Sequence, residues 1–192
     1  MHGSLVPRRT ATNRLIGKLC LFLYAGLCFR SCRRNHSLHH QAAETRDDPD
    51  FRSQPGQSAI RWYWHFLNNY LNKGQLATLA ITWLFYYSIV QFSYSASWVN
   101  LLLFCVLPLI LSSLQLFIVG TWLPHNGNPE DKGMNSPKSL RFDPVLSFAA
   151  CYHFGYHHEH HASPTTPWFQ LPSLQYTNSH NGFKTELHNA TF

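Results

Sequence analysis

The sequence predicts an all-α membrane protein built on a transmembrane helical hairpin, with histidine-rich segments on either side of the hairpin. No Asp, Glu, Lys or Arg occurs between Gly74 and Pro129. Two apolar runs lie within this stretch, Leu76–Phe92 and Trp98–Leu123, and each is about long enough for a hydrocarbon core that takes roughly 20 helical residues. An HxxHH pattern occurs once before the hairpin and once after it.

The two runs are joined by a short polar segment, residues 93–97, so both flanks of the hairpin are expected on one side of the membrane. Of the 15 basic residues, 11 precede the uncharged stretch and 4 follow it. Because basic loops stay in the cytoplasm, that shared side is predicted to be cytoplasmic. The chain is therefore expected to be a multi-pass integral membrane protein with its histidine clusters in the cytoplasm.

The segments outside the hairpin complete the predicted architecture. Leu15–Phe29 is apolar, but its uncharged part, Leu19–Phe29, rises only about 16 Å as a helix, so an interfacial helix is predicted. Asp143 and Pro144 are typical of a helix start, and the helix is expected to run to His161. Residues 1–172 are predicted to form one domain and residues 173–192 a disordered tail.

Composition argues against a disulfide-stabilised protein and against a nucleic-acid-binding protein. The five cysteines are odd in number and form no CxxC pair, as expected of free thiols in a reducing compartment. The net charge of +6 is spread over segments that flank the membrane, so we expect contact with the lipid bilayer and no nucleic-acid partner.

The two HxxHH boxes are the strongest functional signal. On a helix, positions i, i+3 and i+4 share one face, so each box directs its imidazoles to one spot. Imidazole binds iron, zinc, copper and nickel, and two boxes on one membrane face suggest two metal ions. His2 and His125 lie on the same predicted face. The candidate metal ligands are His2, His36, His39, His40, His125, His157, His160 and His161.

Other polar residues near the boxes are candidates for orienting these ligands. Glu159 can accept a hydrogen bond from a ligand imidazole or face solvent. Asp48 and Asp50 can do the same for the first box or form a turn around Pro49, and the turn is slightly favoured. His153 and His158 lie beside the second box but off its i, i+3, i+4 face.

The residues around the boxes resemble the bacterial and cyanobacterial β-carotene ketolases of the membrane fatty acid desaturase superfamily. The resemblance extends to about Pro172. Its most specific parts are Gly120–His125 and Tyr152–His161. The family's first box reads His-Asp-x-Met-His-Gly, and this chain begins at that Met. The resemblance therefore implies an N-terminally truncated chain in which His2 is what remains of that box.

By resemblance, the histidines would bind two ferrous ions that activate O2 with electrons from a ferredoxin or reductase. The implied activity is that of an O2-dependent β-carotene ketolase in carotenoid biosynthesis. Two hydroxylations at C4 of the β-ionone ring would give a geminal diol that loses water, converting β-carotene to echinenone and then canthaxanthin. No catalytic residue is implied beyond the metal ligands.

Three alternatives stay open at this point. The same chemistry could act on another substrate, as in a fatty acyl desaturase or a carotenoid ring hydroxylase. A chain without the first histidine of its first box could be an inactive membrane fragment. A histidine-rich membrane protein that binds zinc would also fit the boxes, and it would retain zinc rather than iron on purification.

Overall fold

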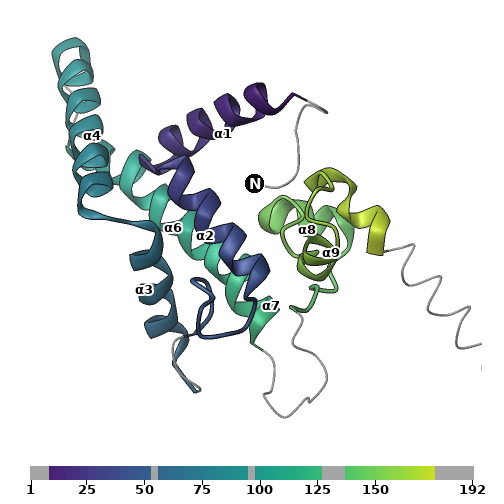
Figure 1. Cartoon of the computed structure of the whole chain (residues 1–192). Helices are drawn as coiled ribbons and strands as arrows, with labels where there is room; N and C mark the ends of the chain where they lie inside the picture. Colours follow the sequence, from purple (N-terminus) through teal and green to yellow (C-terminus); the bar gives the residue numbers. More distant parts are fainter. Residues whose placement is uncertain (1–8, 53–55, 95–97, 127–136, 176–192) are drawn as a thin grey trace, which may run out of the picture.

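In the computed structural model, which describes residues 9–52, 56–94, 98–126 and 137–175, every regular element is a helix (Figure 1). The predicted all-α class is confirmed for these residues. The predicted polar joint of the hairpin and the end of the chain fall mainly outside them. Residues 171–175 are helical, so regular structure continues three residues past the predicted boundary at Pro172.

The first two helices form a sharp bend that carries the first histidine box. Helix α1 spans Thr10–Ala25 and α2 spans Phe29–Gln41, and their axes are bent by 101°. Gly26 ends α1 with a φ of 62°, and its N–H donates to the carbonyls of Leu21 and Phe22. A side chain is disfavoured at this φ, which accounts for glycine here. The chain thus turns into α2, on which the box lies.

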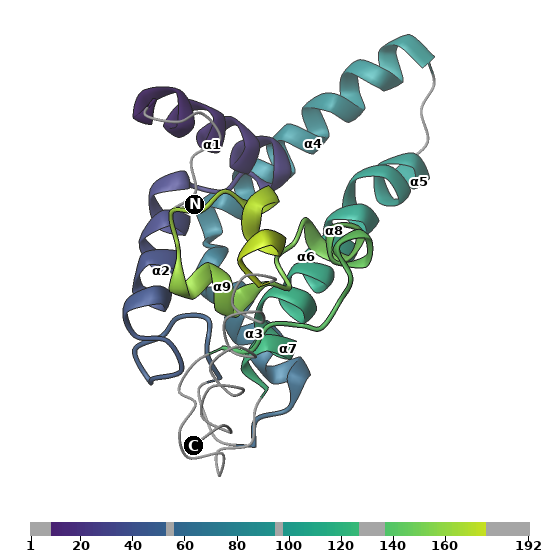
Figure 2. The ribbon, with the colours of Figure 1, turned by 90° about the vertical axis from the view of Figure 1, so that its right-hand side faces the viewer.

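The central part of the fold is a pair of long helices, α4 and the helix that begins with α5. The two diverge toward the end of α4 and the start of α5 (Figure 2). Helix α4 spans Lys73–Tyr94 and begins with a reciprocal cap, in which Asn72 and Gln75 each accept the other's backbone N–H through the side chain. Its partner runs through Trp98–His125 as α5 (Trp98–Leu101), α6 (Leu107–Phe117) and α7 (Leu123–His125), joined by two π-helical segments.

One helix among the described residues, Trp98–His125, is long and apolar enough to cross a membrane. A second would be counted if α1 and α2 formed one bent span. Helix α4 was predicted as the other span and is indeed a helix of 22 residues. Its aromatic and hydroxyl side chains lower its mean hydropathy, so a multi-pass topology stays a prediction.

Helix α3, Ala59–Tyr70, packs across α6 and fixes the loop that follows the first box. Trp62, Phe66 and Phe117 form its buried contact with α6. The Trp62 indole N–H donates to the carbonyl of Asp50 at 2.8 Å, so this aromatic cluster also anchors the acidic loop. The packing therefore places residues 48–50 beside the histidines of α2.

The second box lies on its own short helix. Helix α8 spans Pro144–Cys151 and α9 spans His157–Ala162. The predicted N-cap is confirmed, because the Asp143 side chain accepts from the N–H groups of Val145 and Leu146. The prediction of one helix from Asp143 to His161 is wrong. Tyr152 and His153 adopt left-handed conformations, with φ of 47° and 64°, and this break turns α9 toward α2.

Candidate metal centre

Seven imidazoles from three parts of the chain meet in two adjoining groups. Helix α2 supplies three of them, the end of the long central helix one, and α9 three. One group consists of His39, His125, His157 and His161, and the other of His36, His40 and His160; within each, the ligand nitrogens all lie within 4.8 Å of one another.

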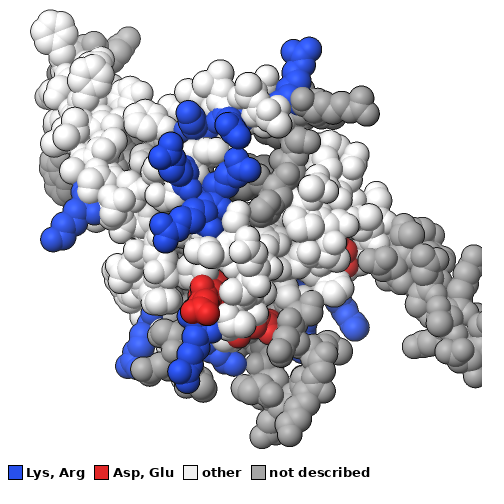
Figure 3. Space-filling model, in the orientation of Figure 1, with Lys and Arg blue, Asp and Glu red and all other residues white. Residues whose placement is uncertain are grey.

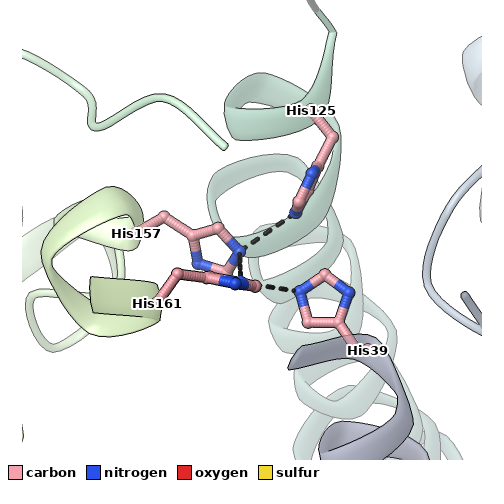
Figure 4. A group of neighbouring side chains, drawn as sticks. All are labelled: His39, His125, His157 and His161. Atoms are coloured by element: carbon pink, nitrogen blue, oxygen red, sulfur yellow. Dashed lines mark hydrogen bonds between the residues drawn. The ribbon is translucent and has the colours of Figure 1, made fainter. Parts of the chain in front are cut away.

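The four-histidine group is the more buried of the two (Figure 4). The Nε2 atom of His157 lies 3.0 Å from that of His125 and 3.2 Å from that of His161. The Nε2 atom of His161 is in turn 3.0 Å from that of His39. Four ring nitrogens from three separate helices therefore converge on one point.

The three-histidine group is half-buried and has similar spacing. The Nε2 atom of His40 lies 3.0 Å from that of His160 and 3.3 Å from that of His36. His160 and His36 complete the triangle at 3.3 Å. The two groups are contiguous, since the rings of His40 and His161 stack with centroids 4.2 Å apart.

These spacings fit a bound transition metal. A metal–imidazole bond is about 2.0–2.1 Å long, so two ligands on one ion are separated by roughly 3.0 Å at a right angle and roughly 3.4 Å at the tetrahedral angle. Burial, reinforced by the neighbouring imidazoles, lowers the pKa of His157 well below its usual range and that of His161 to about 2. Both rings are thus neutral at pH 7, which is the form that binds metal.

Asp48 fixes the orientation of His39. Its two carboxylate oxygens lie 2.9 and 3.0 Å from Nδ1 of His39, which leaves Nε2 of that ring to bind a metal. The same carboxylate accepts the backbone N–H of Asp50 at 2.9 Å. Asp48 therefore both makes the turn around Pro49 and contacts the first box. From the sequence alone, these two roles were alternatives.

Glu44 contacts a second candidate ligand and was missed by sequence reasoning. Its Oε1 lies 3.3 Å from Nδ1 of His125, and its backbone N–H donates to Asp48 at 2.9 Å. Its φ of 62° is disfavoured for any residue with a Cβ. The only sequence signal was an acidic residue shortly after the first box, because its partner is 81 positions away.

The remaining orienting candidates have different surroundings. Asp50 is buried, and its Oδ2 accepts the Tyr70 hydroxyl at 3.0 Å; burial raises its pKa to about 6. Glu159 is buried and accepts the hydroxyl of Ser139, which in turn accepts the backbone N–H of His158 at 3.0 Å. Through Ser139, Glu159 thus stabilises the start of α9. The predicted contact with a ligand imidazole is not what these bonds provide.

The two flanking histidines lie apart from the metal groups. His153 is buried among aromatic rings, with its centroid 5.8 Å from that of Phe148 and 5.9 Å from that of Trp168. The His158 side chain is exposed on the outer face of α9. His2, the remaining predicted ligand, lies outside the described residues.

Comparison with known proteins identifies the family. The family model for fatty acid desaturases matches residues 1–182. The chain belongs to the fatty acid desaturase family. The beta-carotene ketolase of Paracoccus sp. strain N81106 is 41% identical over 91% of this chain and 70% of the relative. That of Paracoccus sp. strain PC1 is 37% identical over 92% of this chain and 71% of the relative.

A further relative is matched over a smaller share of its own length. The beta-carotene ketolase of Haematococcus lacustris is 36% identical over 90% of this chain and 54% of the relative. No solved structure matches the chain. The family assignment therefore rests on the sequence match, and the histidine geometry agrees with it.

In this desaturase-family chain, a cavity of about 970 Å³ extends from the histidine groups between α1, α2, α4 and α6. Its wall includes His36, His39, His157 and His160 from both metal groups. Leucine, isoleucine and aromatic residues form much of the rest, among them Phe66, Leu79, Trp83, Leu109 and Ile110. The volume is at the upper end of the roughly 300–1,000 Å³ usual for ligand pockets. An apolar ligand of considerable size can therefore reach the histidines.

Proposed function

We propose that this chain is a β-carotene ketolase that oxidises the C4 methylene of a β-ionone ring to a ketone. The observation that carries the proposal is the meeting of two histidine groups with one large, mainly apolar cavity. Relatives named beta-carotene ketolase, matched over about nine-tenths of this chain, support the substrate. β-Carotene would give echinenone after one ring is oxidised and canthaxanthin after both.

Two iron ions, one per histidine group, would supply O2 activation when bound, with electrons from a ferredoxin or a reductase. The four-histidine group would hold one ion through His39, His125, His157 and His161. The three-histidine group would hold the other through His36, His40 and His160. His2 is proposed as a further ligand.

Two carboxylates would orient ligands of the four-histidine group for metal binding. Asp48 accepts the Nδ1–H of His39, and Glu44 lies within reach of the Nδ1–H of His125. Each bond fixes the tautomer that leaves Nε2 unprotonated, and it makes the ring a stronger electron donor. These residues position ligands and do not touch the substrate.

The cavity wall would hold the substrate and exclude water from the reacting carbon. Side chains such as Phe66, Leu109 and Ile110 offer a carotenoid only apolar contacts, so burial would supply most of the binding free energy. A ring inserted toward His36 and His160 would bring its ring methylenes, C4 among them, to the metal centre. The membrane is proposed as the source of substrate, with the histidines on its cytoplasmic side.

A second candidate is a fatty acyl desaturase or a carotenoid ring hydroxylase. The observation that favours it is the chemistry of the cavity, because an apolar wall accepts an acyl chain as readily as a carotenoid. Both candidates would use the same histidines. The products distinguish them.

The experiment is pigment and lipid analysis of a β-carotene-producing bacterium that expresses the chain. The same chain with His-Asp-x added before Met1, so that it reads His-Asp-x-Met-His, is tested beside it, and His161→Ala of each form is the matched control. Echinenone or canthaxanthin from either parent, absent from its control, is expected. Hydroxylated carotenoids or new unsaturated acyl chains without ketones would favour the second candidate. No new product from either form would overturn both.

A further inference from the structure

A second apolar surface lies outside the cavity, on α8 and the segment that follows α9. We infer that this surface, formed by Val145, Leu146, Phe148, Tyr152, Trp168 and Phe169, lies in the lipid bilayer interface and borders the mouth of the cavity. Their side chains are 40–78% exposed, the extremes being Trp168 and Val145. The name α8 face is used below for these six residues.

The α8 face is uncharged in sequence as well as in space. No Asp, Glu, Lys or Arg occurs between Pro144 and His158 or between His160 and Phe183. In Figure 3 the molecule is white over α8, whereas one group of basic side chains lies over α1 and α2 and others lie along the lower edge. Six large exposed apolar side chains form a patch that a soluble surface rarely leaves uncovered.

The position of α8 along the membrane helix identifies lipid as what covers the face. The Gln115 side-chain amide donates to the carbonyl of Ala150, which ties α8 to α6. Counted from Trp98, a hydrocarbon core of about 20 helical residues ends near Phe117. Gln115 is therefore at the edge of that core, and α8 lies at the level of the headgroups. Its outward side chains continue the exposed apolar surface at Leu111.

The residue types agree with that level. Tyr152 and Trp168 are amphipathic aromatics of the kind enriched where lipid meets water. Their rings form one cluster with Phe148, whose centroid lies 5.4 Å from that of Tyr152 and 6.0 Å from that of Trp168. A preformed rigid cluster loses little side-chain entropy when it inserts into the interface.

The same face borders the cavity, which gives the lipid contact a consequence. Tyr152, Trp168 and Leu171 contribute to the cavity wall. Helix α1 forms another part of the wall through Gly17 and Leu21. The outer side of α1 is also apolar, with Leu19 and Leu23 exposed by 52% and 74%. With α1 and the α8 face both in the interface, the opening between them faces lipid rather than water.

The test places a fluorescent dansylalanine singly at Val145 or Phe169 of the full chain, with all native cysteines kept. The protein is reconstituted in nanodiscs of phosphatidylcholine and phosphatidylglycerol. Quenching is compared between lipids that carry a nitroxide near the headgroup and iodide in the water. Phe92 is 96% exposed on the apolar helix α4 and serves as the lipid reference, and the exposed Arg61 as the aqueous reference.

At positions 145 and 169 we expect emission shifted to shorter wavelength, loss of intensity with the nitroxide lipid, and little loss with iodide. Iodide quenching as strong as at position 61 would overturn the inference, because the face would then be in water. Protection from both quenchers would also overturn it and would indicate a protein partner or a second copy. None of these readouts requires ketolase activity, so the lipid contact and the proposed function can fail separately.

Discussion

Phe154 packs directly against Gly120, so closely that a Cβ added at Gly120 would lie 2.5 Å from the phenyl ring. The ring also lies close to the histidine groups, with centroid distances of 5.5 Å to His157 and 6.2 Å to His160. Phe154 thus lies between Gly120 of the long central helix and the α9 histidines of the two groups. Only glycine lets the π-helical segment Ile118–Trp122 approach this closely.

Gly120→Ala is therefore expected to displace Phe154 and disturb both histidine groups. Overpacking of this kind costs about 1–3 kcal/mol, so the thermal midpoint and the retained metal should both fall. The measurements are the thermal midpoint in detergent and metal content by mass spectrometry. Replacing the phenyl ring by a smaller side chain should make room for the added methyl group. The double variant Gly120→Ala with Phe154→Leu should therefore regain the thermal midpoint and the metal content.

The control for this prediction is a second glycine beside the same phenylalanine. A Cβ at Gly155 would meet Leu140 at 3.4 Å, an ordinary contact, so Gly155→Ala should behave like the parent chain. Equal losses from both variants would show that the Phe154 contact is not what limits position 120.

Asp48→Asn should weaken the four-histidine group. The asparagine keeps one carbonyl oxygen, but it loses the negative charge that favours the Nδ1–H tautomer of His39. Loss of such a partner typically weakens metal binding by about 10–100-fold. The measurement is competition for cobalt against a chelator, read from the cobalt absorption bands. Asp47→Asn, one residue earlier and exposed, should retain the parent affinity.

Glu44→Gly separates metal binding from backbone strain. Glycine tolerates the φ of 62° and keeps the N–H that donates to Asp48, but it lacks the carboxylate near His125. We expect the metal-free protein to be at least as stable as the parent, while cobalt affinity falls by about tenfold. Glu44→Gln, which keeps an acceptor oxygen, should lose less. Unchanged cobalt affinity in both variants would show that Glu44 does not contribute to metal binding.

The sequence predicted those parts of the centre that follow from local periodicity. The HxxHH spacing brings His36, His39 and His40 to one side of α2, and the hairpin returns the chain so that His125 meets α9. The break at Tyr152 and His153 was not predictable, because neither residue is the glycine that usually marks a left-handed conformation. Glu44 was missed for a different reason. Its contact depends on how two distant segments pack, and no spacing within the chain encodes that.

The neutral histidines predict how stability depends on pH. Burial and neighbouring imidazoles lower the pKa of His157 and His161, whereas unfolded histidines titrate near 6.5. Below that pH these two histidines bind protons in the unfolded chain but stay unprotonated in the folded chain. The free energy of unfolding therefore falls as pH falls. For two histidines the slope approaches about 2.7 kcal/mol per pH unit.

This dependence is checked on chelator-treated protein by following the thermal midpoint from about pH 7.5 to about pH 5.5. The parent should lose stability steadily below about pH 6.5. The double variant His157→Asn with His161→Asn should show a much smaller slope, because its uncharged amides take up no proton. An equal slope in the two proteins would assign the effect to other groups.

The cavity itself can be tested by filling it far from the histidines. Leu109 lies on its wall, 16 positions before His125 on the same helix, which is about 24 Å along the axis. Leu109→Trp should obstruct a long apolar substrate without touching a metal ligand. We expect ketone yield to fall by about tenfold or more, since 1.4 kcal/mol of lost binding already corresponds to tenfold, while metal content stays at the parent level.

The matched control is Leu111→Trp on the same helix, because Leu111 is 56% exposed and points away from the cavity. Pigment analysis and metal content are measured on both variants in whichever form of the chain is active. Ketone loss with metal retained in Leu109→Trp alone would assign the cavity to the substrate. Full ketone yield from Leu109→Trp would mean that the carotenoid approaches the histidines by another path. Loss of metal in Leu109→Trp would instead indicate that the tryptophan disturbs the packing of α6 against α3, on which the acidic loop beside His39 depends.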